Sequence, residues 1–160
     1  MDQYLARWTH ISIQQYFKTI AAGIPLPLFV EGFDERTEAT QRVNHAELRL
    51  TGPNVSNPSS NYWTVEAEVN ILLHDYMESA SADVYSILRW SGIFQDAMLD
   101  PIPIYKRGPD AGDDDSLIGC LVARNREPKA VMVYHFGQMD KDDRLRQSEI
   151  DCLYKLDITS

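Results

Sequence analysis

The run from Tyr62 to Leu99 constrains the fold more than any other stretch, because its apolar period changes within one short connection. From Trp63 to Leu73, apolar and polar residues alternate, which predicts a half-buried β-strand. After a turn at 77–81, apolar residues recur at helical spacing, which predicts an amphipathic helix. Such a helix can fold back over the apolar face of the strand. The run therefore predicts a strand–helix unit at the centre of the domain.

The predicted helix carries one apolar stripe, which indicates the side that faces the sheet. Ser79 or Ser81 can cap its first turn, where Asp83 suits the positive end of the helix dipole. We expect Leu88 and Phe94 to be buried between this helix and the sheet. The full stripe consists of Val84, Ile87, Leu88, Ser91, Phe94 and Met98.

Further elements are predicted on both sides of this unit. Residues 3–22 have helical spacing and are followed by Gly23, which favours a helix end. Two prolines make 25–30 an edge strand or a packed loop. Residues 51–61 are rich in Gly, Pro, Asn and Ser, which predicts an exposed loop between antiparallel strands. The remaining strands are predicted at 43–50, 102–105, 117–123, 130–136 and 149–158.

This order of elements predicts one α+β domain spanning residues 1–160. Its sheet is expected to be mainly antiparallel, built from a long hairpin and the C-terminal strands. We expect the sheet to pack against one long helix at 82–99, with the N-terminal helix as a further element. With 160 residues, of which 44% are hydrophobic, the chain is long enough to bury a substantial core.

The charge balance argues against one large class of function. Lys and Arg number 15 against 24 Asp and Glu, giving a formal net charge of −9. A domain that grips a phosphate backbone needs clustered basic residues, so strong nucleic-acid binding is not expected. The acidity suits solubility, repulsion of nucleic acid or a basic partner. The sequence shows no signal peptide and no apolar run of about 20 residues, so we expect a cytoplasmic protein without a membrane span.

The sequence contains no recognisable catalytic or cofactor motif. It has neither a glycine-rich phosphate loop nor a nucleophile elbow, and we predict no cofactor. The four histidines, His10, His45, His74 and His135, are scattered without i, i+4 spacing, so we predict no metal site and no catalytic residue. An alternative remains open: His74 and Asp75 could form half of an acid–base site in a small α+β enzyme. Otherwise they form a polar strand end beside a turn.

The two cysteines, Cys120 and Cys152, lie in strand-like runs. We interpret both as small buried hydrophobes. A disulfide between them is possible if their strands are neighbours, but two cysteines do not make a disulfide framework.

Two C-terminal strands are apolar on successive residues. In 117–123 and 130–136, this pattern indicates burial on both faces or contact with another subunit. We expect at least one of the two strands to form a subunit interface or to lie beneath one. The candidate interface residues are Leu121, Val131 and Val133.

The order of elements resembles that of the tail terminator or tail completion proteins of long-tailed bacteriophages. It is also similar to that of the related tail-tube and head–tail joining proteins. The sequence departs from the smaller members in its acidic loop at 106–116 and its long loop at 51–61. The resemblance is carried by the helix at 3–22, the hairpin at 43–73, the helix at 82–99 and the closing strand at 149–158.

The resemblance implies a structural virion protein, not an enzyme, whose subunits form a six-membered ring. Such a ring sits at the head–tail junction, caps the tail tube and binds the neck above it. The implied partners are copies of the chain itself, a tail-tube protein and a neck or connector protein. The implied location is the virion tail or neck, with assembly in the host cytoplasm. The alternative within this family is another neck or tail-tube ring of the same virion.

A ring on the DNA exit path is expected to have an acidic lumen, because basic side chains would hold phosphates instead of letting DNA pass without specific binding. The candidate channel-facing acids are Glu66 and Glu68 on the polar strand face, and Asp113, Asp114 and Asp115 in the acidic loop. The alternative for the two glutamates is a solvent-exposed face or a subunit interface. For the three aspartates it is a solvated, mobile loop on the outer wall.

Overall fold

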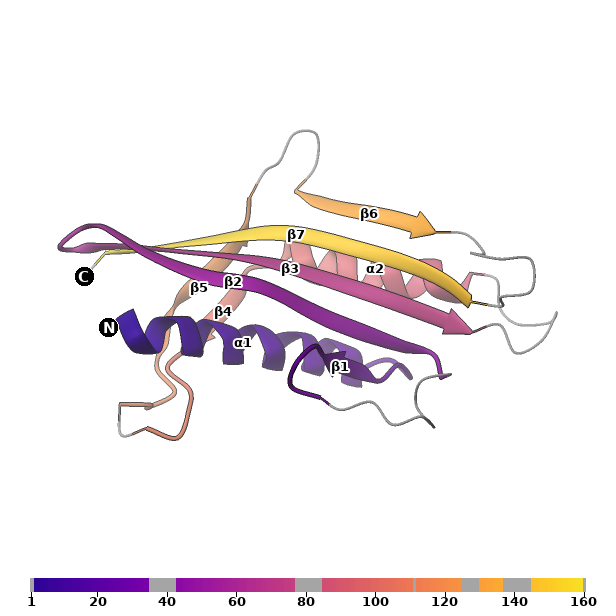
Figure 1. Ribbon diagram of the computed structural model, residues 1–160, viewed down its shortest axis with the longest axis horizontal. Helices are drawn as coiled ribbons and strands as arrows, with labels where there is room; N and C mark the ends of the chain where they lie inside the picture. Colours follow the sequence, from indigo (N-terminus) through magenta and orange to yellow (C-terminus); the bar gives the residue numbers. More distant parts are fainter. Residues whose placement is uncertain are drawn as a thin grey trace.

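Three long antiparallel strands, β2 (His45–Ser59), β3 (Tyr62–Tyr76) and β7 (Leu145–Thr159), form the spine of the molecule (Figure 1). β3 lies between the other two and pairs with β7 along its whole length. Its alternating side chains place one apolar row on one face of the sheet, as the sequence predicted. The computed structural model describes residues 2–34, 43–76, 85–110, 112–124, 130–136 and 145–159.

Four shorter strands complete a seven-stranded sheet. β1 (Leu28–Val30) pairs in parallel with β2 at one end of the strand order. β5 (Leu117–Ala123) and β6 (Val131–Phe136) both pair with β7, each along a different part of the same edge. β4 (Ile102–Tyr105) pairs with β5 and ends the order. The predicted short strand at 102–105 and the strand at 117–123 are thus confirmed.

The expected fold class, a mainly antiparallel sheet packed against one long helix, is wrong. The sheet is mixed, because β1 is parallel, and it curls into a half-barrel that holds two helices. The longer helix is α1 (Asp2–Ala22), which contacts β1, β2 and β4. The shorter helix, α2 (Ser86–Leu99), contacts β3, β6 and β7. Neither described helix has the length and hydropathy to cross a lipid bilayer.

The curl of the sheet has a local cause at β5. Only Val122 and Ala123 of this strand pair with β7, so the β4–β5 ribbon leaves the spine and reaches α1. There the backbone N–H of Tyr105 donates a hydrogen bond of 3.0 Å to Ser12 Oγ on α1. The N-terminal helix, expected only as a further element, therefore lies within the curl of the sheet.

Both helices are fastened to the core by tyrosine hydroxyls. Tyr16 on α1 donates to the carbonyl of Ala97 near the end of α2, at 2.8 Å. Tyr154, which is fully buried on the inward face of β7, donates to the carbonyl of Met98, also at 2.8 Å. These bonds satisfy carbonyls in the last turn of α2, which have no partner within the helix.

The predicted loop at 51–61 is wrong, because β2 continues as a strand to Ser59. Its pairing with β3 shifts register between Thr51 and Asn54, and again between Ser56 and Ser59. Gly52 has a φ of 91°, and a Cβ there would lie 2.9 Å from the backbone nitrogen of Asn54. The Gly and Pro residues therefore belong to a β-bulge, which tolerates both, and not to a loop.

The second helix buries a stripe slightly different from the one expected. Phe94 is completely buried, as predicted, but Leu88 is 46% exposed, so that prediction is wrong. The buried stripe is centred on Ile87, and Leu88 lies about 100° further around the helix axis. The predicted capping residues and Val84 lie outside the described residues. The buried side chains of the helix are Ile87, Ser91, Phe94, Ala97 and Met98.

Two substitutions in α2 test this packing. Phe94→Ala should lower the free energy of unfolding by about 3–5 kcal/mol, because it leaves a cavity in the core. Leu88→Ala, at an exposed position, should change it by less than about 1 kcal/mol. Urea denaturation followed by circular dichroism measures both values. Equal losses from the two variants would contradict the observed orientation of the helix.

Candidate functional site

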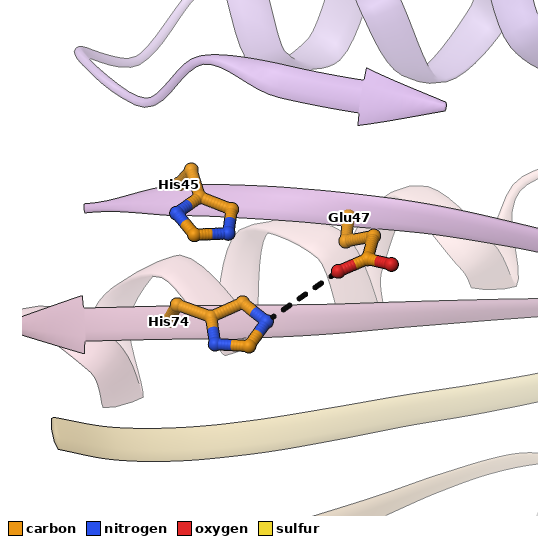
Figure 2. Close-up of side chains that lie close together, drawn as sticks. All are labelled: His45, Glu47 and His74. Carbon is orange, nitrogen blue, oxygen red and sulfur yellow. Dashed lines mark ion pairs between the residues drawn. The ribbon is translucent and has the colours of Figure 1, made fainter. Parts of the chain in front are cut away.

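The sheet has two faces of different character, and one carries a buried cluster of ionisable side chains. Alternate residues of β3 point toward the helices, and the others point to the opposite face. On that opposite face lie His45 and Glu47 of β2 and His74 of β3 (Figure 2). His45 and His74 are directly paired in the antiparallel register, so their rings share one face. Glu47 follows two residues along the same strand.

The three side chains of this His–Glu–His cluster are close together and shielded from solvent. His45, Glu47 and His74 are 1%, 4% and 8% exposed. The two imidazole rings stack with centroids 4.4 Å apart and planes 17° apart. Nε2 of His74 lies 3.7 Å from Oε2 of Glu47. One donor atom from each residue can be chosen so that all three lie within 4.8 Å of one another.

Each histidine is oriented through its Nδ1 atom. Nδ1 of His45 lies 2.7 Å from the carbonyl oxygen of Val43 and must carry the proton, because a carbonyl only accepts. Nδ1 of His74 lies 3.1 Å from the side-chain amide of Gln147 on β7. Each imidazole therefore directs Nε2, the remaining ring nitrogen, away from its Nδ1 contact.

The carboxylate of Glu47 has two different oxygens in this environment. Oε1 accepts hydrogen bonds from the guanidinium of Arg49, at 3.2 and 3.3 Å. Oε2 is the oxygen nearest to His74. Arg49 in turn lies 3.7 Å from Glu31, so the guanidinium is balanced by a second carboxylate.

Aromatic side chains border the cluster. The ring of Phe29, on the parallel strand β1, meets His45 edge-on at 5.6 Å between centroids. The ring of Tyr76 stacks near the same histidine at 6.3 Å. Aromatic neighbours of this kind exclude water and strengthen electrostatic interactions among the charged groups.

This cluster was not predicted from the sequence, because its three members come together only through strand pairing. Within the described part of the chain, it is the one group of three or more His, Cys, Asp or Glu side chains with metal-binding proximity. His45 and Glu47 are two residues apart on a strand, which places them on one face. That spacing was a usable signal, but the contribution of His74 depends on the β2–β3 register.

The proposed partnership of His74 and Asp75 is not formed. These residues are adjacent on a strand, so their side chains point to opposite faces of the sheet. Asp75 faces the helices, where it lies 2.5 Å from Arg146 and accepts a hydrogen bond from Ser86 at 3.0 Å. An acid–base site that uses both residues together is therefore excluded by geometry.

The acidic loop between β4 and β5 is anchored to α1 by two of its aspartates, of which Asp113 makes the more buried contact. The Asp113 side chain is only 3% exposed, and it accepts hydrogen bonds from Arg7 at 2.8 Å and from the Trp8 indole at 2.5 Å. Arg7 also pairs with Asp110. Asp113 is therefore a structural residue of the subunit, in contrast to the solvated loop residue expected from sequence.

The other candidate channel acids have local partners and remain accessible. Asp114 accepts hydrogen bonds from the backbone and hydroxyl of Ser116, and the largely exposed Asp115 pairs with Arg107 at 2.9 Å. Both are exposed at the loop surface.

On the sheet, Glu66 pairs with Arg124 at 2.7 Å. Glu68 is partly exposed on the same polar face of β3. These two glutamates lie on the strand, apart from the aspartates of the loop. Whether either set faces a channel stays a prediction.

The candidate interface residues lie mostly inside the subunit. Leu121 and Val131 are buried, and Val133 packs against the core. The exposed apolar side chains of these strands are different ones: Leu117 and Val122 on β5, and Tyr134 and Phe136 on β6. Contact between subunits through these strands stays a prediction. Cys152 is buried as expected, whereas Cys120 is only half-buried, and the two cysteines are not joined by a disulfide.

The surroundings of Asp113 predict a pH dependence of stability. Partial burial alone would raise the pKa of this carboxyl, but the Trp8 indole, the Asp110 backbone and the Arg7 charge lower the pKa overall. A carboxyl whose pKa is lower when folded stabilises the native state above its unfolded pKa of about 3.9. That contribution disappears as pH falls through the folded pKa. Asp113→Asn should therefore be less stable than wild type at pH 7, and the difference should shrink toward pH 3.

Urea denaturation at pH 7, 4 and 3 measures this difference. Asp115→Asn is the matched control, because that carboxylate is largely exposed, and it should have a smaller effect at every pH. A wild-type advantage over Asp113→Asn that stayed constant from pH 7 to 3 would show that the carboxylate is not linked to folding.

Comparison with known proteins gives information about the fold alone. No family model matches the chain, and no curated protein does. Solved structures are similar to it. One of them, a protein whose name states no function, has a TM-score of 0.51 and 10% sequence identity. The match covers 96% of this chain and 95% of that one, so the similarity extends over the whole domain.

Proposed function

We propose that this chain is a structural ring subunit of a long-tailed phage virion, of the tail terminator or tail completion type. One observation carries the proposal: the exposed apolar side chains on β5 and β6. Tyr134 and Phe136 on β6, with Leu117 and Val122 on β5, are the kind of surface that subunit contacts cover.

The edge of the sheet supports the same proposal. β6 pairs with β7 on one side, and among the described strands nothing pairs with its other side. An open strand edge with apolar side chains invites pairing with another chain, and a ring gives every such edge a partner. A heterologous contact between β6 of one copy and a different surface of the next copy generates a ring when the rotation between copies closes.

The acidity of the chain suits the passage of DNA through such a ring. A net charge of −9 per subunit provides a lumen that repels phosphates. Glu66, Glu68, Asp114 and Asp115 are the proposed lumen acids, because they retain accessible carboxylates. Asp113 is withdrawn from this set, since its side chain is held against α1. The partners proposed for the ring are a tail-tube protein below and a neck or connector protein above.

Oligomeric state tests the proposal. Size-exclusion chromatography with light scattering on the full chain should give a species of about 110 kDa, six times the 18.3 kDa subunit. Negative-stain electron microscopy should show rings. A chain that stayed monomeric at every concentration would contradict a ring formed by this protein alone.

Charge substitutions on β6 test the proposed contact surface. The double variant Tyr134→Lys, Phe136→Lys should be monomeric with an unchanged melting temperature, because both side chains are exposed in the subunit. Leu99→Lys is the matched control, since it places a lysine at another exposed apolar position, at the end of α2, and should still assemble. If the double variant still formed rings, β6 would not be part of the subunit interface.

A further inference from the structure

We propose that His45, Glu47 and His74 bind one divalent transition-metal ion, with zinc the best match. Two imidazoles and one carboxylate are a donor set that zinc prefers. The residues come from two paired strands, and the register that aligns His45 with His74 brings their side chains to one face. The inference is independent of the ring proposal, because it depends on contacts within one subunit.

The distances fit a zinc ion after small side-chain movements. Two ligands at about 2.0–2.1 Å from zinc and at a tetrahedral angle are roughly 3.3 Å apart. The separation of 3.7 Å between His74 Nε2 and Glu47 Oε2 is a few tenths of an ångström wider. The three donor atoms lie within 4.8 Å of one another, so the widest pair must close by up to about 1.5 Å. Rotation of the His45 ring toward the other two side chains can provide this movement.

His45 already has the tautomer that a metal ligand needs. Its Nδ1–H donates to the carbonyl of Val43 at 2.7 Å, so the ring lone pair is on Nε2. A ligating histidine commonly donates its other N–H to a backbone carbonyl, which fixes the ring and raises its basicity. The Val43 carbonyl has this role here.

His74 requires one rearrangement, which Gln147 can accommodate. As described, the amide nitrogen of Gln147 donates to Nδ1, so the ring proton lies on Nε2, toward Glu47. When the amide turns over, its oxygen faces Nδ1, and Nδ1–H can donate to it. The proton then resides on Nδ1 and the lone pair on Nε2 is available to the metal. In a neutral imidazole, this change moves the proton from Nε2 to Nδ1 and releases none.

Arg49 orients the carboxylate for monodentate binding. It holds Oε1 of Glu47 at 3.2 Å, and Oε2 therefore points toward His74 and the proposed ion. The charges of Glu47 and Glu31 together offset part of the charge of the ion and the guanidinium. Phe29 and Tyr76 form the apolar border that such sites use to limit solvent access.

Three protein ligands leave the fourth position of a tetrahedral ion for water or another small oxygen ligand. Because the ligands belong to β2 and β3, a bound ion would also join these strands at their shared end. Metal binding should therefore raise the melting temperature, as any ligand specific to the native state does. This gives a measurement that does not depend on any activity.

The test uses the full chain, stripped of metal with a chelator and then titrated with zinc alone by isothermal calorimetry. We expect one ion per subunit and a higher melting temperature. Cobalt in place of zinc should give visible absorption bands typical of four or five ligands. Glu47→Gln and His74→Asn should each weaken zinc binding at least about 10-fold, since even partners of ligands contribute 10–100-fold. Gln147→Ala should weaken binding less than either.

Matched controls separate this site from other histidines and glutamates. Glu66→Gln, on the same face of β3, and His10→Ala, on α1, should bind zinc as wild type does. Heteronuclear NMR of the wild-type histidines covers the case in which the site variants do not fold. Zinc should then shift Nε2 of His45 and His74 and leave His10 and His135 unchanged.

Three results would each overturn the proposal. The first is the absence of saturable zinc binding below about 1 mM. The second is binding that Glu47→Gln and His74→Asn leave unchanged. The third is an NMR shift confined to His10 or His135. In any of these cases, the cluster is a buried polar network that only helps to join β2 and β3. Ring formation can still occur after any of these results, so failure here is distinguishable from failure of the ring proposal.

Discussion

The pairing of β3 with long strands on both sides determines where nearly every other part of the molecule lies. Because of this pairing, alternate side chains of the three long strands point toward the helices, and the others point to the opposite face. The helices can then dock only on the apolar face. Tyr154 completes the docking of α2, and burial raises the pKa of its phenol well above the ordinary value, so it remains a donor to Met98.

The same register accounts for the chemistry of the opposite face. His45 lies opposite His74, and a slip of one residue in the β2–β3 pairing would separate them onto different faces. The β-bulge near Gly52 absorbs the register shift further along the hairpin, away from the cluster. Irregular and regular pairing thus occupy different parts of β2. The buried polar side chains lie where the pairing is uninterrupted.

Local patterns in the sequence predicted the parts of the fold that depend on local periodicity. The alternation in β3 and β7 and the spacing in α1 were sufficient to identify these elements. The bulge at 51–59 was misassigned because Gly, Pro and Asn occur in loops and bulges alike. The burial of Leu88 was wrongly predicted, because the tilt of the helix against the sheet decides which residues at the edge of an apolar stripe are buried. The curl of the sheet around the helices arises because only a few residues of β5 pair with β7. No local sequence pattern indicates how many residues of a strand will pair.

The candidate site was less predictable than the fold. The spacing of His45 and Glu47 indicates a shared strand face, but their burial and the approach of His74 follow from tertiary pairing. The anchoring of Asp113 could not be predicted from the sequence either, because its partners Arg7 and Trp8 lie on the first helix, more than 100 residues earlier in the chain. In both cases a deciding partner is far away in sequence, His74 in the cluster and Arg7 with Trp8 for Asp113, and local spacing carries no information about such contacts.

The position of β7 in the sheet has a consequence for how the protein is made. This strand follows β3 in the chain only after α2, β4, β5 and β6, yet it is the neighbour of β3, β5 and β6. Until it emerges from the ribosome, the edge of β3 that pairs with β7 is open. Contacts between distant segments slow folding, and transient open edges favour aggregation. The sheet therefore stays incomplete until β7 is made, and chaperone protection of the hairpin would matter most during that interval.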